Sequence, residues 1–511
     1  MSWNEGYVTD IDYTYGHYAE LEPHRALFVL TYAGYSTPKL GNACEIGFGQ
    51  GISLNINAAG SDIRWFGTDF NPNQVANAQR LSEMFQGDMQ IFDDDFLSFL
   101  NRHDLPKFDF ISLHGIWSWV SDQNREIIKE IIRTKLNVGG IVYISYNTLP
   151  GWNQMIPIRN LMMDVMEANT SGMELSNNRV EKTLVSMKNF LNLNPKYFAA
   201  NPAGKKKLED LTAQNKNYVA HEYFNRDWKA MNFSDAAKIL DDAKISYVAS
   251  ANLLENLDVL NLSPEQSKFL NGIENQSLRE TMRDYVLSQT FRKDYWIKGK
   301  LKLSAHERLI ALDKFHLVAT KSLDDFNYKL TCNIGEANLT EDVYKPIVEL
   351  MSDHKPRLIA AIRESLSSVN SISTEQVLEA LYILVGNGTL SLAYDQKNAK
   401  QRFQKTDPLN KYFMEKSVNA TYVNYMVSPL TGSGIPVGRV EQIFIKLYGE
   451  KVENVKDLAA KVQQILETRG QTLTIEGAAV EHGQALEEAL LKAAQRFKDH
   501  LLPIYKSLML L

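Results

Sequence analysis

Cysteine is almost absent from this chain of 511 residues, which contains only Cys44 and Cys332. Two cysteines cannot build a disulfide framework or a zinc site made of cysteines, and we expect no metal site. Glycine (28 residues) and proline (15 residues) are too scarce for a collagenous or low-complexity chain. Hydrophobic residues, at 44%, supply enough apolar side chains to exclude a disordered chain.

Basic charge is also in short supply, because the formal net charge is −6 and the sequence pI is about 6.0. Such a balance gives no overall attraction to nucleic acid or to anionic lipid. No stretch approaches 18 uninterrupted apolar residues, and Met1–Gly6 has neither the basic nor the apolar part of a secretory signal. With so little cysteine, these features predict a cytoplasmic protein that has no membrane span and binds no nucleic acid.

The first 152 residues alternate short apolar runs with helical patterns. Strands are expected at residues 41–46, 63–68, 89–92, 108–114 and 141–146, and helices at residues 23–35, 52–59, 73–84 and 122–136. Because the runs are apolar throughout, we expect each strand to be buried on both faces of a parallel sheet. This pattern predicts a doubly wound α/β fold.

The rest of the chain follows a different pattern. Residues 153–240 are mostly helical, and residues 245–251 and 294–298 are strand candidates that would complete the same sheet after this insertion. A helical pattern from Ser373, followed by a strand at residues 389–392, is typical of a winged-helix-like module. The last 110 residues again read as helical, around a loop at residues 428–436.

One glycine-rich stretch, Glu45-Ile46-Gly47-Phe48-Gly49-Gln50-Gly51, carries the clearest chemical signal. It follows a strand and opens a helix, and Asp69 lies twenty positions after Gly49. Glycines let the backbone turn sharply and approach a ligand. An acid at the end of the second strand accepts hydrogen bonds from ribose hydroxyls in folds of this kind. The stretch therefore predicts a nucleoside-containing cofactor.

The glycine spacing separates the cofactor classes. Dinucleotide sites use G-x-G-x-x-G, whereas this stretch reads E-x-G-x-G-x-G and has no glycine three residues after Gly49. Glu45 would repel a pyrophosphate but suits a ligand with a cationic amino acid moiety. The form resembles the S-adenosylmethionine loop of class I methyltransferases. A nicotinamide or flavin site and a glycine turn without a ligand remain as alternatives.

Further cofactor contacts are expected where the next strands end. Asp94, Asp95 and Phe96 follow the third strand, where class I methyltransferases hold the adenine ring. The predicted cofactor-binding residues are Glu45, Gly47, Gly49, Gly51, Asp69, Phe70, Asn71, Asp94, Asp95, Phe96 and His114. Tyr7, Tyr13, Tyr15 and His17 would either cover the cofactor or simply pack the N-terminal segment.

Aromatic and polar residues cluster after the fourth and fifth strands, at the edge where ligands bind in this fold. The clusters are His114-Gly115-Ile116-Trp117-Ser118-Trp119-Val120 and Tyr146-Asn147-Thr148-Leu149-Pro150-Gly151-Trp152. We predict that Trp117, Trp119, Tyr146, Asn147 and His114 serve the acceptor and catalysis, with no firm general base among them. No Asp/Asn-Pro-Pro-Tyr follows the fourth strand, which disfavours nucleobase and glutamine acceptors.

Together, these stretches resemble the bacterial class I methyltransferases that carry a methyltransferase regulatory domain, including the rickettsial outer-membrane-protein lysine methyltransferases. The resemblance extends to Tyr7-Val8-Thr9-Asp10, His221-Glu222-Tyr223-Phe224-Asn225 and Phe291–Gly299. It implies a dimeric, S-adenosylmethionine-dependent protein lysine methyltransferase whose extra domains hold a protein substrate. A small-molecule methyltransferase and a non-catalytic scaffold with a cofactor fold are the alternatives.

The expected architecture is a Rossmann-like class I methyltransferase sheet with a helical insertion and α-rich C-terminal domains. At about 150 residues per domain, the length allows three or four domains. The predicted regions are a cofactor-binding domain at 1–152, a helical dimerisation insertion at 153–220, a regulatory-type region completing the sheet at 221–300, a winged-helix-like middle domain at 301–400 and a helical domain at 401–511.

Overall fold

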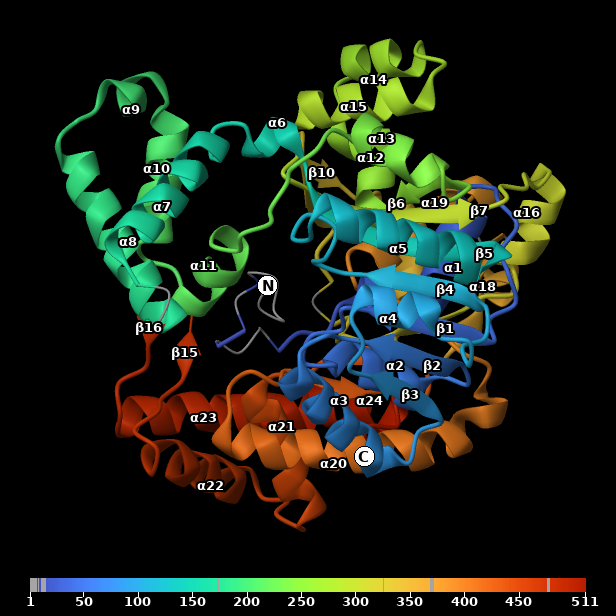
Figure 1. The fold of residues 1–511 in the computed structure, drawn as a ribbon. Helices are drawn as coiled ribbons and strands as arrows, with labels where there is room; N and C mark the ends of the chain where they lie inside the picture. The colour runs from blue at the N-terminus through green and yellow to red at the C-terminus, as the bar shows by residue number, and fades with distance from the viewer. Residues whose placement is uncertain are drawn as a thin grey trace.

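A seven-stranded sheet is the centre of the computed structural model, which describes residues 7, 9, 10, 15–171, 174–324, 326–367, 372–475 and 478–511 (Figure 1). The strand order is β3-β2-β1-β4-β5-β7-β6. The strands are β1 (Asn42–Ile46), β2 (Arg64–Thr68), β3 (Met89–Phe92), β4 (Phe108–Leu113), β5 (Leu136–Asn147), β6 (Ile245–Ser250) and β7 (Phe291–Lys298). All five strands expected in the first 152 residues are present, and both later candidates belong to the same sheet.

The parallel pairing expected for the first five strands is confirmed, and one of the two later strands runs in the opposite direction. Strands β1 to β5 pair in parallel, whereas β7 is antiparallel to both of its neighbours, β5 and β6. The chain reaches the sheet edge in β6, turns through α13 (Asp258–Asn261), α14 (Pro264–Asn271) and α15 (Gln276–Leu287), and returns between β5 and β6. Strand β7 therefore runs in the opposite direction.

Helices cover both faces of the sheet, as the apolar strands predicted. Ala43, Trp65 and Tyr143 face one core, which they share with α1 (Pro23–Tyr32), α2 (Ile52–Gly60) and α3 (Pro72–Phe85). Neighbouring strand residues such as Cys44 and Phe66 face a second core, shared with α4 (Phe96–Asn101), α5 (Asp122–Lys135) and α12 (Phe233–Asp241). Successive side chains on a strand point to opposite faces, so continuous apolar runs supply both cores.

The helical insertion has a small core of its own. It consists of α6 (Leu149–Trp152), α7 (Ile156–Asn169), α8 (Ser176–Asn192), α9 (Lys196–Ala200), α10 (Pro202–Leu211) and α11 (Lys216–Tyr223). Met162, Leu184, Met187 and Leu208 are among the side chains buried between these helices. Figure 1 shows α7 to α10 projecting from the sheet on the left of the molecule. The Met-rich pattern of this region thus serves helix packing.

The middle region combines helices with a small antiparallel sheet of order β11-β8-β12. Its elements are α16 (Ala305–Leu312), β8 (His316–Ala319), a hairpin of β9 (Lys329–Cys332) and β10 (Gly335–Asn338), α17 (Glu341–Met351), β11 (Arg357–Leu358), α18 (Ile359–Ser367), α19 (Thr374–Gly386) and β12 (Leu390–Ala393). The expected helix followed by a strand corresponds to α19 and β12. The winged-helix interpretation and all five domain boundaries stay predictions.

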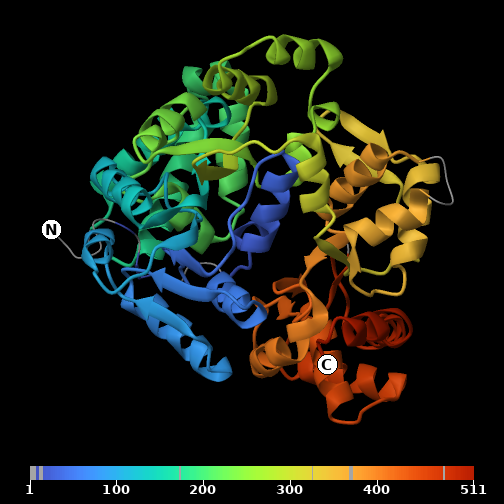
Figure 2. The ribbon, with the colours of Figure 1, turned by 90° about the vertical axis from the view of Figure 1, so that its right-hand side faces the viewer.

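The C-terminal region packs directly on the sheet domain. It consists of α20 (Ala399–Asn419), β13 (Tyr425–Val427), β14 (Gly434–Pro436), α21 (Arg439–Gly449), α22 (Val455–Glu467), β15 (Thr474–Ile475), β16 (Ala478–Ala479), α23 (Gln484–Arg496) and α24 (Leu502–Ser507). Helix α20 lies against α2 and α3, where the C-terminal region meets the sheet domain (Figure 2). The buried Arg402 on α20 pairs with Asp62 at 2.9 Å. Within the described ranges, no helix has the length and apolarity that crossing a membrane requires.

Candidate functional site

The glycine-rich turn joins β1 to α2 at the carboxyl end of the sheet. Gly47, Gly49 and Gly51 all have positive φ angles, of 70°, 57° and 72°. A Cβ on Gly47 would lie 2.3 Å from Cδ1 of Ile116, and one on Gly51 would lie 2.5 Å from Cβ of Ala78. The turn therefore needs glycine for both its backbone conformation and its close packing.

Asp69, at the end of β2, holds this turn in place. Its Oδ2 accepts a hydrogen bond from the Gly49 amide at 2.9 Å, and its Oδ1 accepts one from the Asn71 amide at 3.0 Å. Gln74, with its amide nitrogen turned toward Asp69, donates to both oxygens at 3.0 and 2.9 Å. Burial raises the pKa of Asp69 to about 7, although the two backbone donors oppose this shift.

Glu45 lies beside Asp69 but lacks this support. The residue is only 4% exposed, and its Oε2 is buried without a hydrogen-bond partner among the described residues. Burial, with a further contribution from the negative charge of Asp69, raises the pKa of Glu45 to about 8. Leaving a buried carboxyl oxygen unpaired is costly. A ligand that brings a positive charge to this oxygen would offset the cost.

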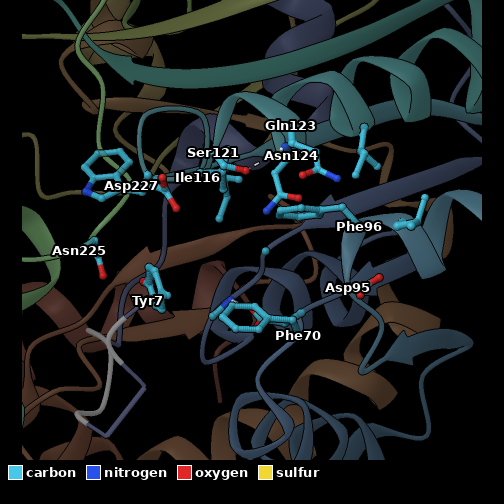
Figure 3. Close-up of a pocket in the computed structure, with 18 of the residues that line it drawn as sticks. Tyr7, Phe70, Asp95, Phe96, Ile116, Ser121, Gln123, Asn124, Asn225 and Asp227 are labelled. Carbon is cyan, nitrogen blue, oxygen red and sulfur yellow. Dashed lines mark hydrogen bonds between the residues drawn. The ribbon is translucent and has the colours of Figure 1, made fainter. Parts of the chain in front are cut away.

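Two adjoining hollows surround these residues. The larger, of about 200 Å³, is lined by Tyr7, Gly47, Gly49, Asp69, Phe70, Gln74, Asp95, Phe96, Leu97, His114, Gly115, Ile116, Trp119, Val120, Ser121, Gln123, Asn124, Ile127, Asn225 and Asp227 (Figure 3). The smaller, of about 30 Å³, contains Glu45 and Gly51 and is closed by Gly16, Tyr18 and Ser53. Gly47, Gly49 and His114 border both hollows, so the turn separates two parts of one site.

The predicted adenine residues differ in their access to the larger hollow. Asp95 and Phe96 line it, while Asp95 also caps α4 through the Ser98 amide at 2.7 Å. Asp94 does not line it, because its carboxylate pairs with Arg102 at 2.9 Å. Phe70 lines the hollow, whereas Asn71 is buried outside it as the N-cap of α3.

His114 stands where the two hollows meet. Its Nδ1 lies 2.9 Å from the hydroxyl of Tyr143, and its ring stacks on Tyr18 with 3.8 Å between the ring centroids. Burial lowers the pKa of His114 to about 4, so the imidazole is neutral near pH 7. A group with such a low pKa is a weak proton acceptor for an ammonium ion. The geometry favours His114 as part of the wall.

Of the other predicted acceptor residues, only Trp119 lines the hollow. Trp117 is fully buried in the core between the sheet and α5, and the Tyr146 hydroxyl donates to Asp294 at 3.0 Å beneath the sheet. Asn147 is also buried: its backbone N–H donates to Oγ of Ser118 at 2.8 Å, and its side-chain Nδ2 has no hydrogen-bond partner among the described residues. Tyr146 and Asn147 still belong to β5, which runs further than expected. Trp117, Tyr146 and Asn147 therefore do not line this hollow, and their role toward an acceptor stays a prediction.

The structure also brings in residues that sequence reasoning did not assign. Ser121, Gln123 and Asn124 come from the start of α5, directly after the aromatic stretch, and that proximity was the available signal. Asn225 and Asp227 come from the region after α11, about 180 residues from the glycine turn; Asn225 ends a stretch that carries the family resemblance, whereas no local pattern indicated Asp227.

The N-terminal aromatic residues divide between the two roles considered for them. Tyr7 lines the larger hollow and contacts the edge of Phe70, with 5.9 Å between the ring centroids. Tyr15 stacks on Tyr422, and Nε2 of His17 accepts a hydrogen bond from the Gly434 amide at 3.3 Å, so both pack against the C-terminal region. Tyr13 lies outside the described residues.

The sheet order, with its single antiparallel strand, and the glycine turn that ends β1 define the fold of the class I S-adenosylmethionine-dependent methyltransferases. The model of the predicted methyltransferase regulatory domain matches residues 215–298. The uncharacterized protein sll1526 of Synechocystis sp. (strain ATCC 27184 / PCC 6803 / Kazusa) is 36% identical over 513 residues, which cover 99% of each chain. The chain belongs to the same family as that protein, a family of bacterial methyltransferases with a methyltransferase regulatory domain.

Rickettsial proteins are similar as well. The uncharacterized protein RP789 of Rickettsia prowazekii (strain Madrid E) is 24% identical over 322 residues, which cover 60% of this chain and 56% of that protein. The solved structure of PKMT2 from Rickettsia typhi in complex with AdoHcy has a TM-score of 0.66 at 17% identity and covers 95% of this chain and 98% of that one. The whole architecture, including the insertion and the C-terminal region, therefore recurs in a solved structure.

Glu45 should make stability depend on pH in a recognisable way. A carboxyl group with a folded-state pKa near 8, against an ordinary 4.5, keeps its proton in the native state while the unfolded chain loses it. Stability therefore falls as pH rises from about 4.5 to 8, and the penalty is complete above pH 8. We expect the free energy of unfolding of Glu45→Gln, relative to that of the wild type, to rise by about 2–4 kcal/mol between pH 5.5 and 8.5, measured by urea unfolding. The variant Glu83→Gln, at an exposed position, serves as the control and should stay at a constant difference from the wild type. If the difference in free energy of unfolding between Glu45→Gln and the wild type does not change with pH, Glu45 is not protonated in the folded state and the assignment is wrong.

Proposed function

We propose that this protein is an S-adenosylmethionine-dependent protein lysine N-methyltransferase that acts on a surface or outer-membrane-type protein. The observation that carries the cofactor assignment is the buried, unpaired oxygen of Glu45 beside the glycine turn. S-adenosylmethionine carries an ammonium group on its amino acid moiety, which would pair with this oxygen. A pyrophosphate there would add negative charge to two carboxyl groups that are already buried together, which disfavours a dinucleotide.

The remaining residues fit the rest of the cofactor. Asp69, within the larger hollow, would accept hydrogen bonds from the ribose hydroxyls. Asp95 would receive the exocyclic amine of adenine, with Phe96 against the ring, while Asp94 is held by Arg102. The glycines of the turn would allow the ligand to approach the backbone. PKMT2 was solved with AdoHcy, the demethylated form of S-adenosylmethionine, which supports the same ligand here.

The mouth of the larger hollow has features that suit a lysine side chain. When bound, S-adenosylmethionine supplies an electrophilic methyl group on a positively charged sulfur. Trp119 and Tyr7 offer apolar ring surface there, which would exclude water around an amine. Desolvation lowers the pKa of an amine, and aromatic faces stabilise its charged form by about 0.5–2 kcal/mol. We assign no general base, and we assign His114 to positioning because its pKa of about 4 is too low for that task.

The choice of a protein substrate rests on the resemblance to the rickettsial lysine methyltransferases and on the regions beyond the sheet. The fold likeness to PKMT2 spans almost the whole chain, including regions that add nothing to the cofactor hollows. Such regions are best explained as surfaces that hold a macromolecule. The net charge of the whole chain, −6, makes nucleic acid an unfavourable partner. A cytoplasmic location is part of the proposal, on the low cysteine content.

The direct test is methyl transfer. The protein is incubated with labelled S-adenosylmethionine and a mixture of bacterial surface proteins, and the methylated residues are located by mass spectrometry. We expect label on lysine side chains with the wild type and at least a tenfold loss with Asp69→Ala, which removes the ribose contact and the support of the turn. Label on small molecules alone would favour the small-molecule alternative. Absence of cofactor binding would favour the scaffold.

We also propose that the helical insertion mediates a homodimer, as the resemblance implies. Several large apolar side chains on α8, at its ends and on α9 are exposed although a separate core lies beneath them. They are Leu175 (65% exposed), Val185 (54%), Phe190 (38%), Leu193 (76%) and Tyr197 (42%). Burying such a group against a second copy would remove it from water, and each side chain contributes about 1.5–3 kcal/mol on full burial.

The dimer assignment predicts a change of mass when these side chains become charged. The wild type should sediment at twice the 58.1 kDa of the chain, and the double variant Val185→Glu, Leu193→Glu should sediment as a monomer. Both positions are exposed, so the fold should survive, and circular dichroism would verify it. A matched variant at an exposed apolar residue elsewhere, Phe269→Glu, should leave the mass unchanged. A wild-type monomer, or a dimer that persists in the double variant, would contradict the assignment.

A further inference from the structure

The larger hollow has two ends that differ in chemistry. Asp95 and Phe96 stand at one end, next to Gln123 and Asn124, while Asn225 and Asp227 stand at the other, near Tyr7 (Figure 3). The first end is the one that the proposed function gives to the cofactor. The second end is formed largely by the matched regulatory domain, which begins at residue 215. That domain therefore contributes directly to the mouth of the site.

Charge is distributed unevenly along this hollow. Among the described residues that line it, three carry carboxyl groups and none is lysine or arginine. The proposed function gives Asp69 and Asp95 to the cofactor, and each already accepts a backbone amide, from Gly49 and Ser98 respectively. Asp227 alone lies at the end away from the cofactor residues. A cation that enters from this end would therefore meet the Asp227 carboxylate first.

The backbone around Asp227 is fixed to the same loops that form the hollow. The Lys229 amide donates to the carbonyl of Ser118 at 2.8 Å, and the Met231 amide donates to the carbonyl of Asn147 at 3.1 Å. Trp228, the next residue after Asp227, packs against Trp152, with 4.7 Å between the ring centroids. The main chain thus holds Asp227 at a constant distance from the loop after β4 that carries Trp119.

Among the described residues, the side chain of Asp227 pairs with Arg226, and this partner is exchangeable. Arg226 donates to its Oδ2 through Nη2 at 2.8 Å and Nε at 3.2 Å, with the Arg226 side chain 56% exposed and that of Asp227 33% exposed. Ion pairs with this much exposure contribute little stability. A carboxylate that accepts a guanidinium at this position would equally accept the ammonium of a lysine.

We infer that Asp227 is a specificity-determining residue that binds the charged side chain of the incoming lysine at the mouth, in competition with Arg226. The inference rests on the proposed function. A carboxylate beside an ammonium ion raises the pKa of the amine, so Asp227 would oppose deprotonation if the amine stayed with it. Asp227 therefore binds the lysine in its charged form, before the amine is deprotonated. The amine then passes to the apolar part of the hollow near Trp119, where desolvation lowers its pKa.

The test measures the binding of n-butylammonium, a mimic of the lysine side chain, to the protein saturated with S-adenosylhomocysteine. Ligand-observed NMR at pH 7 gives the affinity, with n-butanol as the uncharged probe of the same shape. We expect Asp227→Asn to weaken the binding of n-butylammonium about fivefold or more and to leave the binding of n-butanol unchanged. Arg226→Gln removes the guanidinium that competes for Asp227, so this variant should bind n-butylammonium more tightly than the wild type.

The matched control is Asp122→Asn. Asp122 carries the same charge close to Asp227, because it pairs with Lys229 at 3.0 Å, but it does not line the hollow. This variant should bind n-butylammonium as the wild type does. With a lysine peptide as acceptor, Asp227→Asn should raise KM and leave kcat within about twofold, as expected for lost ground-state binding.

The binding role of Asp227 and the proposed lysine methylation can be refuted separately. If the wild type and Asp227→Asn bind n-butylammonium equally, the inference about Asp227 is overturned, whatever the acceptor is. If n-butylammonium binding depends on Asp227 while no lysine peptide is methylated, the capture site stands and the proposed lysine methylation falls. An equal loss in Asp122→Asn would reduce the effect to general surface charge and would also overturn the inference.

Discussion

Two carboxyl groups buried side by side, Glu45 at the end of β1 and Asp69 after β2, are the constraint on which the site depends. Each disfavours the charge of the other, and burial adds to the cost. Asp69 accepts hydrogen bonds from the backbone amides of Gly49 and Asn71, and the turn that presents the Gly49 amide has Gly47, Gly49 and Gly51 in left-handed conformations. Oε2 of Glu45, in contrast, has no hydrogen-bond partner among the described residues. The cofactor assignment follows from this difference between two neighbouring acids.

Regions far apart in the sequence meet at the wall of the smaller hollow. The Tyr18 amide donates to Ser53 at 3.0 Å, and Tyr18 also stacks on His114. One residue earlier, His17 accepts hydrogen bonds from the C-terminal loop at Gly434, and two residues later Glu20 pairs with Lys293 on β7 at 2.6 Å. The N-terminal segment thus closes the hollow around Glu45 while it contacts both the regulatory region and the C-terminal region.

This arrangement gives the extra regions a role in shaping the site. Asp227 comes from the regulatory domain and lies at the mouth, whereas the C-terminal loop fixes His17 behind the cofactor wall. Helix α20 adds a second attachment through Arg402 and Asp62, beneath α2. A protein substrate held by these regions would contact elements that are bonded directly to the cofactor hollow.

Local sequence patterns predicted the sheet and the sharp glycine turn after β1, because their causes are local. Continuous apolar runs require burial on both faces, and the E-x-G-x-G-x-G spacing requires a sharp turn after β1. Other features were not predictable from local patterns. The direction of β7 depends on a pairing between residues about 150 positions apart, and the burial of Trp117 and Tyr146 depends on which face of β5 and its neighbouring turn meets the core.

Asp227 was beyond sequence reasoning for the same reason. An aspartate next to an arginine in a polar segment has no local pattern that separates a binding residue from a solvated surface residue. Only the pairing of residues 229–231 with the loops after β4 and β5 brings it to the hollow. Which strand ends border the hollow could be predicted from sequence, whereas the residues contributed by a distant region needed the fold.

The central claim is that Glu45 gives up its proton to receive the cationic end of S-adenosylmethionine, and calorimetric titration tests it most directly. Titrations near pH 7 in two buffers of different ionisation enthalpy count the protons released on binding. With a free-state pKa of about 8, Glu45 should release close to one proton, and affinity should rise with pH up to about 8. Glu45→Gln should bind more weakly and lack this release. Equal proton release by the wild type and Glu45→Gln, or none by either, would contradict the account.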